Sequence, residues 1–274
     1  MTGRMSTAFV VGAMLAMAGC SSPPAKPPAA VASAVQVYAA GSLREVFTEL
    51  AAAHQARTGQ RVELSFGASG LLRERIEQGA PAQVFASADT QHPERLAARG
   101  GWQAPVVFVR NGLCALTSDQ VHATPGTLLA TLLRPDIRVG TSTPGADPSG
   151  DYAWELFRRA EVAHPGAFAV LDAKALQLTG GARSPKPPAG RSTYAWVMEQ
   201  GQADVFLTYC TNAIASQREL PRLQVVQVPP ELQVGAAYGV SVRSDAPPAA
   251  HAFARALLSE SARAVFMRMG FAAP

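Results

Sequence analysis

The chain has 274 residues, enough for one large or two modest domains, each with its own core. Hydrophobic residues make up 48% of it and charged residues 16%, a balance that excludes global disorder. The formal net charge is +4, but no run or stripe of lysine and arginine accompanies it, which argues against nucleic-acid binding.

Residues 1–19 have the features of a bacterial secretion signal. Arg4 supplies a positive charge, and the apolar run at residues 8–18 is too short to span a membrane. Small residues before Cys20, with serines and prolines after it, indicate cleavage there and a lipid on its thiol. The alternative is an ordinary signal peptide with an incidental cysteine. Residues 20–34 have too little apolar surface to pack into a core, so we expect them to form a tether.

Short apolar strands alternate with amphipathic helices from residue 35 onward. Three strand–helix units follow one another, and a corner of small residues joins each strand to its helix. This order favours a parallel sheet with right-handed crossovers. We expect the strands at residues 35–39, 61–66 and 83–86, and the helices at 43–58, 71–78 and 93–99.

The corner at Gly41-Ser42 has the chemistry of an anion site. The first N–H groups of a helix have no intrahelical acceptor and carry the positive end of the helix dipole, and Ser42 adds a hydroxyl donor beside them. Ser69 stands in the same position at the second corner. A serine at a helix start is also a common N-cap, which is the structural alternative for both residues.

A second set of strands and helices follows the pair of strands around Asn111-Gly112. The last helix needs a sheet to cover, and placing it on the first half gives a two-lobed α/β protein. We expect lobe 1 at residues 35–112 plus 229–274 and lobe 2 at 113–228, with a ligand cleft between them. The expected strands are 106–109, 113–117, 138–141, 204–208, 223–228 and 237–242, and the helices 125–133, 152–160, 192–199 and 251–269.

Two cysteines remain in the predicted mature domain, Cys114 and Cys210. An exported protein meets an oxidising compartment, so they either form a disulfide or stay as two buried thiols. The five histidines lie far apart, and no pair has the spacing of a metal site. The corners match neither a phosphate-binding loop nor a nucleophile elbow, so we expect no enzyme, no cofactor and no directly bound metal.

Five segments, in order, resemble the periplasmic molybdate-binding proteins, the substrate-binding components of molybdate ABC transporters. The resemblance runs from Val37 to Phe271 and implies a two-lobed periplasmic binding protein of type II. Each lobe would then be a mixed, mostly parallel sheet flanked by helices. The segments are Ala39–Leu43, Ser65–Gly70, Ile76–Asp89, Asp204–Tyr209 and Phe266–Phe271.

The resemblance implies a cage of neutral donors around a tetrahedral oxyanion, which is bound through its oxygens. The serines of the family fall on Ser42 and Ser69, and its tyrosine on Tyr209. The two amides of the second lobe fall near Ser149 and on Arg191. Several preorganised N–H and O–H donors can offset the cost of desolvating a dianion.

Residues 172–191 depart from the usual family segment and place an arginine at a binding position. Two roles for Arg191 are open. Its amide alone contacts the ligand, or its guanidinium enters the cleft and favours a doubly charged or larger anion.

The function implied is a monomeric, extracytoplasmic lipoprotein, anchored in the periplasm through Cys20. It would deliver molybdate, and also tungstate, to an ABC permease. The alternatives are a binding protein for another anion, sulfate or an organic acid, and a membrane-anchored anion sensor.

Overall fold

The computed structural model describes residues 1–3 and 33–274. The predicted lipidation site Cys20, with nearly all of the predicted signal and tether, lies outside the described residues. Among the residues that are described, no helix has the length and apolar character needed to cross a membrane.

The strands of residues 33–274 form one continuous mixed sheet of nine strands. Its order is β2-β1-β3-β9-β4-β7-β5-β6, and β8 pairs with β4 beside this path. The strands are β1 (Val35–Ala40), β2 (Val62–Gly67), β3 (Val84–Ser87), β4 (Val106–Thr117), β5 (Val139–Ser142), β6 (Leu176–Thr179), β7 (Val205–Tyr209), β8 (Gln224–Gln227) and β9 (Gly235–Val242).

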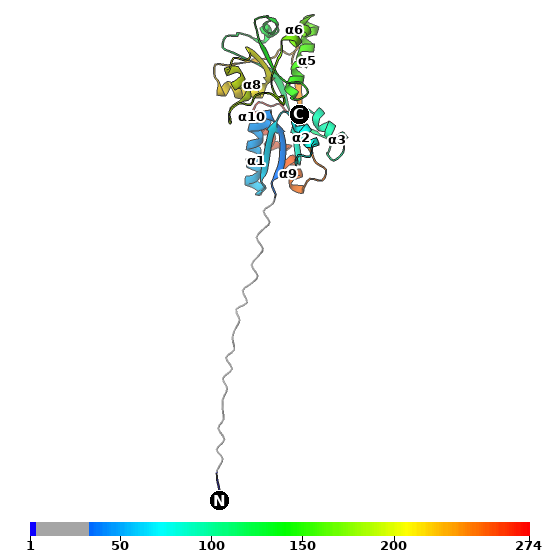
Figure 1. The fold of residues 1–274 in the computed structure, drawn as a ribbon, viewed down its shortest axis with the longest axis vertical. Coiled ribbons are helices and arrows are strands. Elements are labelled where there is room, and N and C mark those ends of the chain that lie inside the picture. Colours follow the sequence, from blue (N-terminus) through cyan, green and yellow to red (C-terminus); the bar gives the residue numbers. More distant parts are fainter. Residues whose placement is uncertain (4–32) are drawn as a thin grey trace. The chain divides into compact units, whose positions relative to one another are not determined.

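Strand β4 belongs to both halves of this sheet. Residues 106–112 pair with β9, which lies beside β3, and residues 113–117 pair with β7 and β8. We call β1, β2, β3 and β9 with their helices the first lobe, and β5 to β8 with theirs the second lobe. Figure 1 shows the two groups of elements one above the other, with α1 and α9 in one and α5 and α6 in the other. The predicted two-lobed α/β fold is confirmed, while its lobe boundaries stay a prediction.

The side chain of Gln233 ties together the two segments that connect the lobes. Gln233 lies on the return path between β8 and β9, and its amide brackets the backbone of Leu113 in β4. Leu113 N–H donates to Gln233 Oε1 at 3.0 Å, and Gln233 Nε2 donates to the Leu113 carbonyl at 3.1 Å. The two crossings are therefore held side by side.

Helices cover both faces of the sheet in each lobe. In the first lobe α1 and α9 lie against one face, and α2 and α3 against the other, as Figure 1 shows. The helices are α1 (Arg44–Thr58), α2 (Ser69–Glu77), α3 (Gln91–Ala98), α4 (Leu128–Leu133), α5 (Pro148–Ala163), α6 (Ala167–Lys174), α7 (Thr193–Glu199), α8 (Cys210–Glu219), α9 (Pro248–Leu257) and α10 (Glu260–Arg268), with the 3₁₀ turns η1 (Gly41–Leu43) and η2 (Pro125–Thr127).

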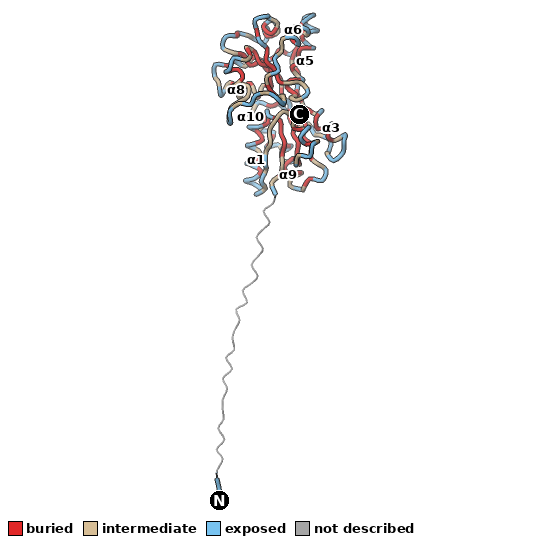
Figure 2. Tube along the Cα trace, viewed as in Figure 1, coloured by how far each residue is buried: buried red, intermediate tan, exposed pale blue. Residues whose placement is uncertain are grey.

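The core follows the alternation of side chains along the strands. In β1, Val37 belongs to the apolar cluster beneath α1 and α9, while its neighbour Tyr38 belongs to the cluster beneath α2 and α3. Phe47 of α1 meets Phe108 and Phe266 edge to face, with ring centroids 6.1 and 6.3 Å apart. Figure 2 shows the buried residues concentrated along the strands and on the inner sides of the helices. The end of the chain thus packs on the first lobe, as expected.

The predicted single helix at residues 251–269 is wrong. Ser259 adopts an extended backbone conformation, and its side chain accepts a hydrogen bond from Ala262 N–H at 3.2 Å. This N-cap ends α9 and starts α10 as a separate helix. The two strands expected around Asn111 are one strand, β4, and the sequence patterns also missed α6, β6 and α8.

Cys114 and Cys210 form a disulfide, with their Cα atoms 4.8 Å apart. The register explains the approach, because Cys114 in β4 lies opposite Thr208 in β7, two residues before Cys210. Of the two states open from the sequence, the structure has the disulfide. It ties β4 to the first residue of α8.

Replacing both cysteines by alanine is expected to lower the free energy of unfolding by about 2–4 kcal/mol, because the bond restricts the unfolded chain. Its 96-residue sequence separation makes that restriction substantial. Urea unfolding of the double variant measures the loss. Reductant should destabilise the native protein by a similar amount and leave the double variant unaffected. A native protein insensitive to reductant under unfolding conditions would contradict this.

Candidate functional site

A cleft of about 700 Å³ lies where the corners of the first lobe face the second lobe. Four of the five predicted ligand residues line it: Ser42 and Ser69 from the first lobe, and Arg191 and Tyr209 from the second. Ser149 lies behind the wall and is fully buried. The structure therefore brings residues from distant parts of the chain to one place.

Ser42 lies in the 3₁₀ turn η1, directly after β1. Apolar residues hold this turn in place, because Leu43 at its end is completely buried. The Ser42 hydroxyl is 2.9 Å from the hydroxyl of Tyr238 in β9. Its backbone N–H is at the start of the turn, where no intrahelical acceptor exists. Ser42 thus brings its backbone N–H, and a hydroxyl group that it shares with Tyr238, to the cleft.

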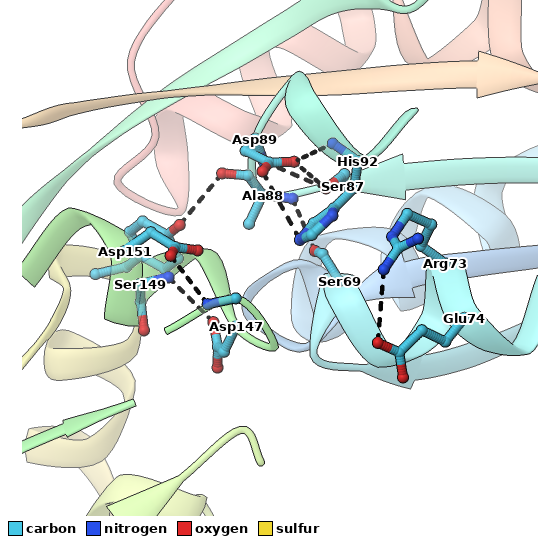
Figure 3. Close-up of polar contacts among 12 residues, drawn as sticks. Ser69, Arg73, Glu74, Ser87, Ala88, Asp89, His92, Asp147, Ser149 and Asp151 are labelled. Carbon is cyan, nitrogen blue, oxygen red and sulfur yellow. Dashed lines mark hydrogen bonds and ion pairs between the residues drawn. The ribbon is translucent and has the colours of Figure 1, made fainter. Parts of the chain in front are cut away.

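Ser69 is the first residue of α2, and only 1% of it is exposed. Its hydroxyl oxygen accepts the Ala88 N–H at 3.1 Å, so its own proton remains available to a ligand. Figure 3 shows Ser69 beneath the third corner, where Ala88 lies. An interaction with the protein therefore orients the hydroxyl without consuming its donor.

The third corner is fixed by its own side chains. Ser87 donates to Asp89 Oδ1 at 2.7 Å, and the same oxygen accepts the His92 N–H at 3.2 Å (Figure 3). Burial lowers the pKa of His92, which favours its neutral form. This arrangement holds Ala88 between Ser69 and the second lobe.

Tyr209 ends β7 and reaches across to the first lobe. Its hydroxyl donates to the Ala88 carbonyl at 3.2 Å, and 1% of the residue is exposed. Burial raises the pKa of Tyr209 well above 10, so it keeps its proton at neutral pH. Tyr209 therefore supplies a neutral donor that a ligand oxygen could take over from Ala88.

Ser149 has different partners from those its predicted role requires. Its N–H donates to Asp147 Oδ1 at 3.1 Å, and its hydroxyl donates to Ser142 Oγ at 2.7 Å. Asp147 is the N-cap of α5 and itself lines the cleft. In this structure the Ser149 N–H, which was predicted to donate to the ligand, thus donates to the Asp147 side chain instead. The role of Ser149 stays a prediction.

Both functional groups of Arg191 are engaged with protein groups. Its N–H donates to the Pro188 carbonyl at 3.2 Å. Its guanidinium pairs with Glu199 at 2.9 Å and with Glu219 at 2.5 Å. Two carboxylates balance its charge, so the guanidinium adds no net positive charge to the cleft. Its role as an amide or a side-chain ligand also stays a prediction.

A buried polar network behind Ser42 was not predicted from the sequence. Asn111 Nδ2 donates to Thr211 Oγ1 at 2.8 Å and to the Tyr238 hydroxyl at 3.3 Å. Asn111 lies in β4 and Thr211 in α8, so the network joins the lobes beside their connection. The signal in the sequence was a polar residue within an apolar strand, which the predicted break at Asn111-Gly112 obscured.

The carboxyl group of Asp147 does not fit a cage of neutral donors, and it is less exposed than the other charged side chains of the cleft wall except Arg191. The exposed ones are Arg44, Glu45, Lys186, Arg218 and Glu219. Two like unit charges 4 Å apart repel by about 4 kcal/mol at an effective dielectric constant of 20. Burial raises the pKa of Asp147, which reduces this charge. Within residues 1–3 and 33–274, no group of three metal-ligating side chains comes together.

The lobes touch directly beside Ser69. Gly70 N–H in α2 donates to the Ala146 carbonyl of the second lobe at 2.8 Å. A Cβ atom on Gly70 would lie 2.5 Å from the Gly145 oxygen and 2.7 Å from the Ala146 oxygen. The three nearest atoms all belong to the second lobe, so only this closed arrangement requires a glycine.

Gly70→Ala is expected to weaken ligand binding by about 1–3 kcal/mol, because the added methyl group obstructs closure. In the presence of ligand, small-angle scattering should show a larger radius of gyration for the variant than for the native protein. Circular dichroism should show that the two have the same fold. Gly126→Ala is the control, since its Cβ atom meets nothing closer than 4.0 Å. Equal affinity of Gly70→Ala and the native protein would contradict the closure contact.

Residues 35–272 match the family described as bacterial extracellular solute-binding protein. A protein of Pasteurella multocida described as uncharacterized is 40% identical over 206 residues, 74% of this chain and 85% of that protein. The molybdate-binding protein ModA of Mycobacterium tuberculosis is 28% identical over 284 residues, 100% of this chain and 97% of that protein.

Solved structures that share the fold include a molybdate-binding and a sulfate-binding protein. The periplasmic molybdate-binding protein of Azotobacter vinelandii has a TM-score of 0.69 and 20% identity, covering 88% of this chain and 99% of that chain. The sulfate-binding protein SubI of Mycobacterium tuberculosis has a TM-score of 0.72 and 21% identity, covering 87% of this chain and 86% of that chain. At these identities the likeness is one of fold.

Proposed function

Because the chain belongs to the family of bacterial extracellular solute-binding proteins, we propose that it captures molybdate, and also tungstate, for an ABC importer. The family and its fold are those of solute-binding proteins and not of enzymes. A relative that spans the whole chain is named for molybdate binding, which supports this choice of ligand.

The observation that carries the proposal is the convergence of neutral donors on the cleft. The hydroxyl groups of Ser42, Ser69 and Tyr209 come from three different elements and line one cavity. Two of them stand at helix starts, where backbone N–H groups add to the donor set. Such donors offset the desolvation of an oxyanion without a full counter-charge.

The remaining parts of the proposal concern location and partners. We infer that Cys20 carries a lipid, that the protein acts as a monomer outside the cytoplasm, and that an ABC permease recognises the closed form. The closed contact between Gly70 and Ala146 supports the last point, because it makes a surface that exists only when the lobes meet.

Titration calorimetry of the mature protein with molybdate, tungstate, sulfate and phosphate tests the ligand. We expect molybdate and tungstate to bind more tightly than the other two anions. Sulfate is the pertinent competitor, because a neighbour of the same fold is named for it. Tighter binding of sulfate than of molybdate or tungstate would contradict the proposed ligand but would still agree with an oxyanion-binding site.

Ser69→Ala and Ser42→Ala are each expected to weaken oxyanion binding by about 1–3 kcal/mol, because a donor to a charged acceptor is lost. Calorimetry measures the change. Ser259→Ala is a control, since it removes an N-cap serine remote from the cleft. If both cleft serines can be replaced with no loss of affinity, they serve only as structural groups at helix starts.

A further inference from the structure

Asp147 is an acid in the wall of the cleft that contains the predicted neutral donors. It lines the same cavity as Ser42, Ser69 and Tyr209. It directly follows Ala146, whose carbonyl accepts from Gly70 N–H at 2.8 Å, and Gly70 directly follows Ser69. Figure 3 shows Asp147 beside Ser149, with Ser69 and Ala88 in the neighbouring corners of the first lobe. Asp147 therefore lies in the wall of the cavity that holds the donors predicted for the anion.

The backbone at Gly180 packs closely against the side chain of Asp147. Gly180 has a φ of +75°, and a Cβ atom on it would lie 2.5 Å from Asp147 Cβ and 2.6 Å from Oδ2. A glycine is thus needed for the backbone to pack against this carboxyl group. Gly180 lies in the segment that departs from the resembled family, so Asp147 and its cover form one local arrangement.

Asp147 forms no ion pair with any described residue, and the lysine and arginine side chains Lys186 and Arg218 that share its cleft are exposed. Oδ1 accepts the Ser149 N–H, and the groups that act on its titration from the same helix and nearby strands are acidic or neutral. Two cations of the cleft wall are engaged elsewhere: Arg191 with two glutamates and Arg44 over the ring of Phe66. The titratable groups facing Asp147 or sharing its cleft are Asp151, Tyr194, Tyr209, Tyr238, Arg44, Glu45, Lys186, Arg191, Arg218 and Glu219.

A carboxylate and a dianion cannot share this enclosed space without strong repulsion. Protonating the carboxylate removes that repulsion and turns an acceptor into a donor. We propose that Asp147 takes up one proton from solvent when the cleft closes on an oxyanion, and then donates a hydrogen bond to it as the neutral acid. The proton returns to solvent on opening. This inference rests on the proposed oxyanion function and adds that capture is coupled to protons.

The coupling fixes the sign of the pH dependence. A group whose pKa is higher in the bound state than in the free state makes binding strongest at low pH. Affinity then falls by up to tenfold for each unit of pH above the pKa of the free protein. Native affinity for molybdate should therefore decrease with rising pH across the range in which free Asp147 has lost its proton and the bound form keeps it.

The substitution Asp147→Asn removes the ionisable group but keeps the N-cap of α5. Asparagine is as good an N-cap as aspartate, and its side-chain oxygen can still accept the Ser149 N–H, but it does not ionise. The variant should bind molybdate with an affinity that changes less than about twofold over the same pH range. Asp119→Asn makes the same chemical change at an exposed turn and should keep the native pH profile.

The decisive measurement is calorimetry of molybdate binding in buffers of different ionisation enthalpy, which counts the protons taken up. We expect uptake approaching one proton for each ligand in the native protein and in Asp119→Asn, and none in Asp147→Asn. Binding with no uptake in the native protein overturns this proposal and leaves the proposed function intact. No binding of any oxyanion overturns both. The native measurement decides the matter even if Asp147→Asn does not fold.

Discussion

The structure depends on how polar groups are satisfied where the two lobes meet. At the start of α2, Ser69 accepts from Ala88 and Gly70 donates to Ala146, so each of these contacts spans two separate segments of the chain. Tyr209 completes the arrangement through the Ala88 carbonyl. Buried polar groups without partners are costly, so this seam forms only in a narrow range of geometries. The need to satisfy these polar groups therefore determines the shape of the cleft.

Charge is distributed around the cleft by the same logic. The guanidinium of Arg191 is balanced by two glutamates, and the tyrosines stay protonated because they are buried. The donors predicted for the ligand are therefore dipoles and not ions. Among the charged side chains of the cleft wall, Asp147 is the exception, because the others are exposed or, in Arg191, paired with glutamates. An exception of this kind at a functional position indicates a role, because a buried carboxyl group is otherwise a cost to folding.

Sequence patterns predicted the parts of the fold that local chemistry determines. The first three strand–helix units and the corners with Ser42 and Ser69 follow from periodicity and small residues, which act over a few positions. The disulfide and the Asn111–Tyr238 contact depend on strand register across the whole chain, which no local pattern encodes. The partners of Ser149 were missed because an aspartate two residues earlier satisfies its amide. The helix break at Ser259 was missed because apolar spacing continued through it.

The connection between the lobes limits how they can move. Strand β4 runs unbroken through both halves of the sheet, and Gln233 clamps the returning segment to it at Leu113. The returning segment cannot slide along β4 without breaking both hydrogen bonds of Gln233 to Leu113, whereas a twist or bend keeps them. This clamp favours opening by a rotation about an axis close to Leu113. The displacement of each lobe grows with its distance from that axis, so a small rotation near Leu113 would separate the lobes widely at the mouth of the cleft.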